Sequence, residues 1–145
     1  MRNYTIYLIE EEVARHYFGQ ESKLFHLFLE QLRSSEEKGT VIQKQIEYIT
    51  SPIPVLHIQQ LVKQQFKGST DYRLIKDRHY YTLRPDSHAE LMIQPDKLIL
   101  SADGNFEVET VFFEGIRKWS PCFFAVDLDH FRYGWLNPIK QMKLI

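Results

Sequence analysis

The chain has 145 residues, of which 43% are hydrophobic and 26% are charged, the proportions of one soluble globular domain. Its 18 basic and 19 acidic residues leave a net charge of −1, which gives no strong positive field for gathering nucleic acid, so we expect no direct binding to DNA or RNA. The single cysteine excludes an internal disulfide and favours a reducing cytoplasm, and no stretch approaches the roughly 20 apolar residues that cross a bilayer.

The start of the chain predicts one strand and two helices. Residues 4–9 are almost continuously apolar and rich in β-branched and aromatic side chains, which is typical of an interior strand. Residues 10–19 predict a short helix, because acidic residues begin it and Gly19 can end it in a left-handed cap. A second helix is predicted from Glu21 to Arg33. Its predicted core residues recur at helical spacing: Leu24, Phe25, Phe28, Leu29 and Leu32.

Two pairs of apolar side chains on the first helix point in neighbouring directions. At about 100° per residue, Val13 lies in line with Tyr17, and Ala14 lies in line with Phe18. Together they span a wide arc for so short a helix. In one interpretation all four are core residues. In the other, Ala14 and Phe18 face the core while Val13 and Tyr17 face a partner protein, and the pattern alone leaves both open.

A polar connection is predicted over residues 34–39 and a third helix from Thr40, which matches a capping box with Gln43. The core stripe of this helix is Ile42, Ile46 and Ile49. Gln45 and Tyr48 lie about 60–100° from the centre of that stripe. A tyrosine in such a place is either a partly buried surface residue or a rigid anchor in an interface, and both interpretations stay open.

The rest of the chain predicts one helix followed by a strand-rich half. Pro52 breaks the third helix, and Pro54 opens another. The later predicted elements are an extended stretch at 72–83, a hairpin across Pro95–Asp96, a helix from Glu107 to Lys118, and strands at 122–128 and 131–136. The predicted fold is α/β (α+β), a single domain over residues 1–145. Its helix-rich N-terminal half packs on a β-sheet supplied by the first strand and the C-terminal half.

Few residues are candidates for catalysis. Cys122 would be a nucleophile if a histidine met it, but it lies in an apolar run where a free cysteine is usually inert. Asp127 and Asp129 would share one face of a strand, near His130, and could hold a hard cation or act as acid and base. The spacing matches no specific metal motif, so we expect no metal, no cofactor and no catalytic site.

Five stretches in order along the chain resemble the family of sporulation inhibitors of replication, SirA. They are Arg-His-Tyr-Phe-Gly-Gln-Glu-Ser (15–22), Glu-Tyr-Ile-Thr-Ser-Pro-Ile-Pro-Val-Leu-His (47–57), Glu-Thr-Val-Phe-Phe-Glu (109–114), Trp-Ser-Pro-Cys-Phe (119–123) and Arg-Tyr-Gly-Trp-Leu-Asn-Pro (132–138). The resemblance implies a non-enzymatic, cytoplasmic protein that needs no cofactor. It also implies binding to the N-terminal domain of the replication initiator DnaA, as a monomer in a one-to-one complex, to stop initiation during sporulation.

The resemblance also implies a set of partner-binding residues. Tyr17, Gln45, Tyr48 and Pro138 match the family's DnaA-binding positions, and Val13 stands where the family carries a larger aromatic residue. Two alternatives are a small enzyme that uses Cys122 or the Asp127/Asp129 pair, and a protein-binding regulator of the same fold with another target.

Overall fold

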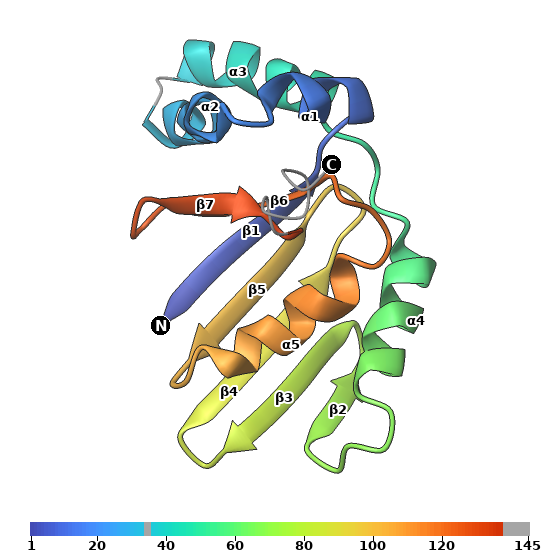
Figure 1. Cartoon of the computed structure of the whole chain (residues 1–145). Helices are drawn as coiled ribbons and strands as arrows, with labels where there is room; N and C mark the ends of the chain where they lie inside the picture. Colours follow the sequence, from blue (N-terminus) through green and yellow to red (C-terminus); the bar gives the residue numbers. More distant parts are fainter. Residues whose placement is uncertain (34–35, 138–145) are drawn as a thin grey trace.

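A computed structural model describes residues 1–33 and 36–137 and confirms a mixed α/β fold (Figure 1). The helices and strands in chain order are β1 (Arg2–Leu8), α1 (Glu11–Tyr17), α2 (Glu21–Arg33), α3 (Glu36–Ile49), α4 (Val55–Gln65), β2 (Tyr72–Ile75), β3 (Arg78–Arg84), β4 (Ser87–Ile93), β5 (Leu98–Asp103), α5 (Glu107–Ile116), β6 (Phe123–Asp127) and β7 (Arg132–Trp135). The first half is helical after β1, and the second half supplies the other strands, as predicted.

The strands form one antiparallel sheet in the order β2-β3-β4-β5-β1-β6-β7. Strand β1 lies inside the sheet, with Thr5 opposite Ile99 of β5 on one side and opposite Val126 of β6 on the other. This interior place explains why the strand is almost continuously apolar. The predicted hairpin across Pro95–Asp96 is confirmed as β4 and β5.

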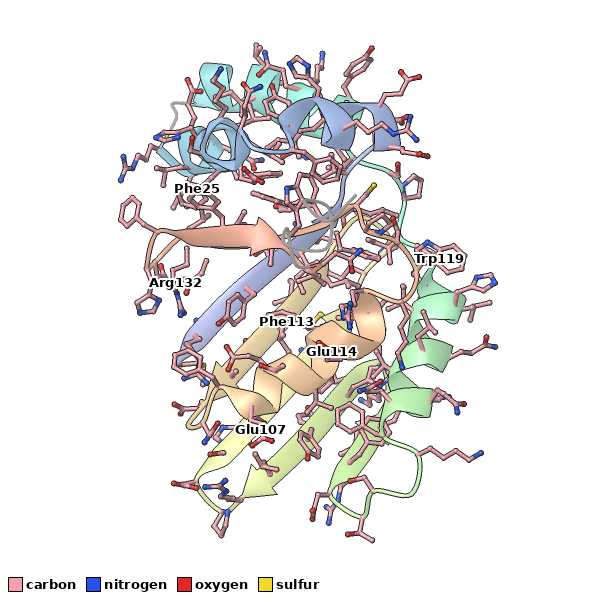
Figure 2. All side chains as sticks on the ribbon, viewed as in Figure 1. Phe25, Glu107, Phe113, Glu114, Trp119 and Arg132 are labelled. Carbon is pink, nitrogen blue, oxygen red and sulfur yellow. The ribbon has the colours of Figure 1, made fainter. Side chains whose placement is uncertain are left out.

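The helices cover different parts of the two faces of the sheet. Successive side chains of a strand point to opposite faces. On one face, Tyr7 of β1 stacks on Phe28 of α2 with ring centroids 4.3 Å apart. On the other face, Tyr4 meets Phe113 of α5 edge to face at 5.3 Å. Figure 2 shows the same division, with Phe25 between α2 and β7 and Phe113 on α5.

The first two helices lie where they were predicted. Gly19 follows α1 with φ +86°, the left-handed conformation expected of a glycine cap. Ala14 is fully buried, and the ring centroid of Phe18 lies 5.0 Å from that of Trp135. The prediction for Leu32 is wrong, because this residue is 65% exposed near the end of α2. The sheet packs against earlier residues of α2, such as Phe25 and Phe28. Leu32 continues the same helical stripe, but the sheet does not cover it.

Helix α3 begins earlier than predicted. We expected a polar connection through residue 39 and a capping box at Thr40, but α3 starts at Glu36 and contains both Gly39 and Thr40. A glycine inside a helix costs about 1 kcal/mol. Burial of Ile42 and Ile46 against the domain is a larger favourable term, so packing overrides the local breaker.

The extended stretch at 72–83 is two strands rather than one. Strands β2 and β3 pair antiparallel around a turn in which Lys76 has φ +58°. Tight hairpin turns usually place glycine or asparagine at such a position. Because lysine carries no such signal, the turn could not be identified from local sequence.

His79 on β3 is fully buried. The Tyr72 hydroxyl lies 2.5 Å from its Nδ1, and its Nε2 has no hydrogen-bond partner among the described residues. Burial, reinforced by the positive charge of Lys63, lowers the pKa of His79 from 6.5 to about 4. The folded protein therefore holds this ring neutral at a pH at which the unfolded chain would protonate it.

This buried ring predicts an acid-sensitive stability. Between about pH 6.5 and pH 4 the unfolded chain binds a proton that folded His79 does not, so the free energy of unfolding falls as the pH falls. We expect a loss of about 2–3 kcal/mol across this window, levelling off below pH 4. Urea titrations of wild type and His79→Phe at several pH values measure it, with His88→Gln, an exposed histidine of β4, as control. Equal pH dependence in wild type and His79→Phe would contradict it.

Candidate protein-binding surface

Three of the five residues predicted to bind a partner line one open groove. The groove has a volume of about 620 Å³ and lies between α1, α2 and α3 (Figure 1). Tyr17 reaches it from α1, while Gln45 and Tyr48 reach it from α3. Tyr17 of α1 therefore meets Gln45 and Tyr48 of α3 on one surface, although the two helices are separated in sequence by α2.

Helix α3 buries its isoleucine stripe against the domain and exposes other residues to solvent. Ile42 and Ile46 are buried. Gln45 and Tyr48 lie on the flank of this stripe, and the side chain of Tyr48 is 83% exposed. A large aromatic side chain so exposed contributes little to the fold, and it offers a rigid apolar surface with a polar tip to a partner.

The other predicted residues stand apart from the groove or outside the described chain. Tyr17 and Val13 are both half-buried and pack against the edge of the core. Tyr17 lines the groove, whereas Val13, one turn earlier on α1, is not among its lining residues. Pro138 lies outside the described residues, which end at 137.

Several groove residues were missed by the sequence analysis. The floor is formed by Leu24 and Leu27 of α2 and by Ile49 of α3, and Val41 lines the groove with 58% of its surface exposed. Val41 lies seven positions before Tyr48, so both lie on one side of a helix. Val41 already lies in the helix predicted from Thr40, so the helical wheel that placed Tyr48 would have identified it. The groove also contains charged residues of both signs: Lys23, Lys44 and Glu30.

Cys122 does not have the surroundings of a catalytic nucleophile. Its side chain is buried beside β6, and its backbone N–H donates to the Ser120 hydroxyl at 3.1 Å. Burial raises the pKa of the thiol, so the thiol stays protonated at neutral pH. The structure therefore favours the inert interpretation of this residue.

The predicted Asp127/Asp129 pair is not formed. Strand β6 ends at Asp127, which is fully buried, and Asp129 lies in the exposed turn that follows. Asp127 instead accepts hydrogen bonds from Arg132 at 2.7 Å and from His130 at 2.9 Å. Burial alone would raise the pKa of Asp127, but these bonds outweigh it and lower the pKa. Among the described residues, no group of three or more His, Cys, Asp or Glu side chains is placed to hold a metal ion.

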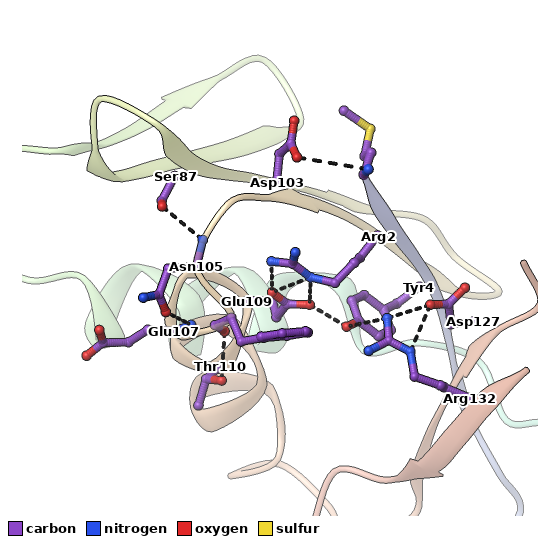
Figure 3. A network of polar contacts seen from close by, with 12 residues as sticks. Arg2, Tyr4, Ser87, Asp103, Asn105, Glu107, Glu109, Thr110, Asp127 and Arg132 are labelled. Carbon is purple, nitrogen blue, oxygen red and sulfur yellow. Dashed lines mark hydrogen bonds and ion pairs between the residues drawn. The ribbon is translucent and has the colours of Figure 1, made fainter. Parts of the chain in front are cut away.

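A buried ion-pair network links α5 to the centre of the sheet (Figure 3). Glu109 of α5 is 2% exposed and accepts three hydrogen bonds from the Arg2 guanidinium, the shortest at 2.6 Å. The Tyr4 hydroxyl also donates to Glu109, and Arg132 lies 3.5 Å from the same hydroxyl. Glu109 falls within the helix predicted from Glu107 to Lys118, and nothing in that local sequence indicates a partner on β1. Every carboxylate of this network is paired, so we assign it a structural role.

An α+β domain with an open groove that is bordered by one exposed and one half-buried tyrosine is typical of a small protein-binding regulator. The family model described as "Sporulation inhibitor of replication protein SirA" matches residues 2–140. The chain is also 45% identical over 148 aligned positions to the SirA protein of Bacillus subtilis (strain 168), covering 99% of each chain. The chain belongs to the SirA family of sporulation inhibitors of replication. In the described part of the chain, every helix is too short or too polar to span a membrane.

Proposed function

We propose that this protein stops the initiation of chromosome replication during sporulation by binding the N-terminal domain of DnaA. Membership of the SirA family supports the inhibitory role. The observation that carries the choice of surface is that Tyr17, Gln45 and Tyr48, which match the family's binding positions, line one groove. Val13 and Pro138 are proposed as further partner-binding residues, on the family resemblance alone.

The proposed mechanism is steric competition. DnaA uses its N-terminal domain for self-assembly or for contacts with other initiation factors, and a bound inhibitor would cover the surface that those contacts need. A few rigid aromatic anchors carry most of the affinity in such interfaces, because their burial removes a large apolar area from water. We propose that Tyr48 and Tyr17 are these anchors and that one monomer binds one DnaA domain in the cytoplasm.

The first test is a calorimetric titration of the full chain with the isolated N-terminal domain of DnaA from the same organism. We expect a saturating one-to-one isotherm. The absence of binding by calorimetry and by a second method would reject DnaA as the target. A regulator with another target would then be the remaining interpretation.

Tyr17→Ala tests the contribution of α1. We expect it to weaken binding to the DnaA domain by about 30- to 1000-fold, since truncating a central aromatic anchor costs about 2–4 kcal/mol. Tyr17 also packs against the core, so the melting temperature of the variant must be measured beside its affinity. A folded variant with wild-type affinity would remove Tyr17 from the interface, and an unfolded variant would show that its role is structural.

A further inference from the structure

The groove between α2 and α3 combines an apolar floor with an excess of positive charge. Its floor is Leu24, Leu27 and Ile49, of which the last two are only half-buried. Two of its three side chains that are charged at neutral pH are lysines, one from each of the two helices, and Glu30 is the third. His26 also lines the groove, and its Nδ1 lies 2.6 Å from the carbonyl oxygen of Ser22.

The two lysines differ in their surroundings. Lys23 donates to the side-chain oxygen of Gln20 at 2.9 Å, which holds its ammonium group near the start of α2. Lys44 is exposed, lies one helical turn before Tyr48, and has no carboxylate partner among the side chains that the structure describes. A partner that covers Tyr48 would also cover Lys44, and water would be excluded from both.

We infer that the partner places an apolar side chain on the floor of the groove and, beside it, a carboxylate that pairs with Lys44. This inference rests on the proposed function and adds the chemistry of the contact. The apolar side chain is required by Leu27 and Ile49, which are open to solvent in the free protein. The carboxylate is required by charge complementarity, because a covered lysine without an anionic partner opposes binding.

Two substitutions of Lys44 and one matched control test this contact. Lys44→Met keeps the length of the side chain and removes the charge, and Lys44→Glu reverses the charge. Lys67→Glu makes the same reversal at an exposed residue that follows α4 and is not among the residues that line the groove. Affinity for the DnaA N-terminal domain is measured at about 50 mM and about 300 mM salt, since screening weakens partly exposed charge pairs. Circular dichroism confirms that each variant is folded.

We expect Lys44→Glu to weaken binding by about tenfold or more at low salt, and Lys44→Met by a smaller factor. Both should reduce the salt dependence of the dissociation constant, and Lys67→Glu should bind like wild type.

Three outcomes would contradict this inference. If Lys44→Met binds like wild type and only Lys44→Glu binds weakly, the loss comes from repulsion by the new carboxylate, and the pair between Lys44 and a partner carboxylate is overturned. Equal affinities of Lys44→Glu and Lys67→Glu would also overturn the Lys44–carboxylate pair. In that case the proposed function would still stand if the wild-type protein binds the domain and Tyr48→Ala does not. If the wild-type protein does not bind the DnaA domain, both the proposed function and the Lys44 contact are rejected.

Discussion

Tyr48→Ala is expected to weaken binding to the DnaA N-terminal domain by about 30- to 1000-fold while leaving the fold unchanged. The side chain is 83% exposed, so its loss removes almost no buried area from the folded protein. Surface substitutions of this kind usually change the free energy of unfolding by less than about 0.5 kcal/mol. In a complex the same ring would be covered, and truncating a central aromatic anchor costs about 2–4 kcal/mol of binding.

Calorimetry with the DnaA domain, together with a thermal melt of each variant, measures this prediction. Leu56→Ala is the matched control, because Leu56 is 73% exposed on α4 and does not line the groove. Tyr48→Phe separates the ring from its hydroxyl, and we expect it to retain most of the affinity if the apolar ring is the anchor. Wild-type affinity in Tyr48→Ala would show that the α3 face is not the binding surface.

Glu109→Ala is expected to give the largest loss of stability among substitutions in the Arg2–Glu109–Tyr4 network. Removing this carboxylate leaves the Arg2 guanidinium, only 14% exposed, without its partner, and leaves the Tyr4 hydroxyl without its acceptor. Breaking a buried ion pair from one side costs about 3–5 kcal/mol, because the remaining charge stays desolvated. Domains of this kind have a total stability of about 5–15 kcal/mol, so the variant should unfold at a much lower urea concentration.

The control for this prediction lies two residues away on the same helix. Glu107 is exposed in the first turn of α5, where Glu107→Ala should cost only the favourable interaction with the helix dipole, about 0.3–1 kcal/mol. Urea unfolding of both variants at pH 7 compares a buried carboxylate with an exposed one. Similar losses in the two variants would mean that the network in Figure 3 contributes little to stability.

Much of the candidate surface could be predicted before the groove was visible. The position of Tyr48 followed from its angle to the isoleucine stripe of α3, and the resemblance to the SirA family selected it as a binding residue. The wheel of α1 was less informative, because Val13, Tyr17 and Phe18 are all half-buried and only Tyr17 reaches the groove. Neither pattern indicated that Leu27 and Ile49 line the groove: Ile49 was assigned to the core stripe of its helix, and Leu27 was assigned no role.

The sequence by itself determined which segments are helices or strands, for most of the elements, and it determined the family. Hydrophobic periodicity reports which face of a helix or strand is buried, and the cap at Gly19 and the hairpin at Pro95–Asp96 are local signals. Only the tertiary structure decided where α3 begins, why Leu32 is exposed, and that Glu109 pairs with Arg2 across 107 residues. These features depend on which surface each segment meets. A local pattern contains no information about a partner that is distant in sequence, whether that partner is the sheet beneath α2, the arginine on β1 or the facing wall of the groove.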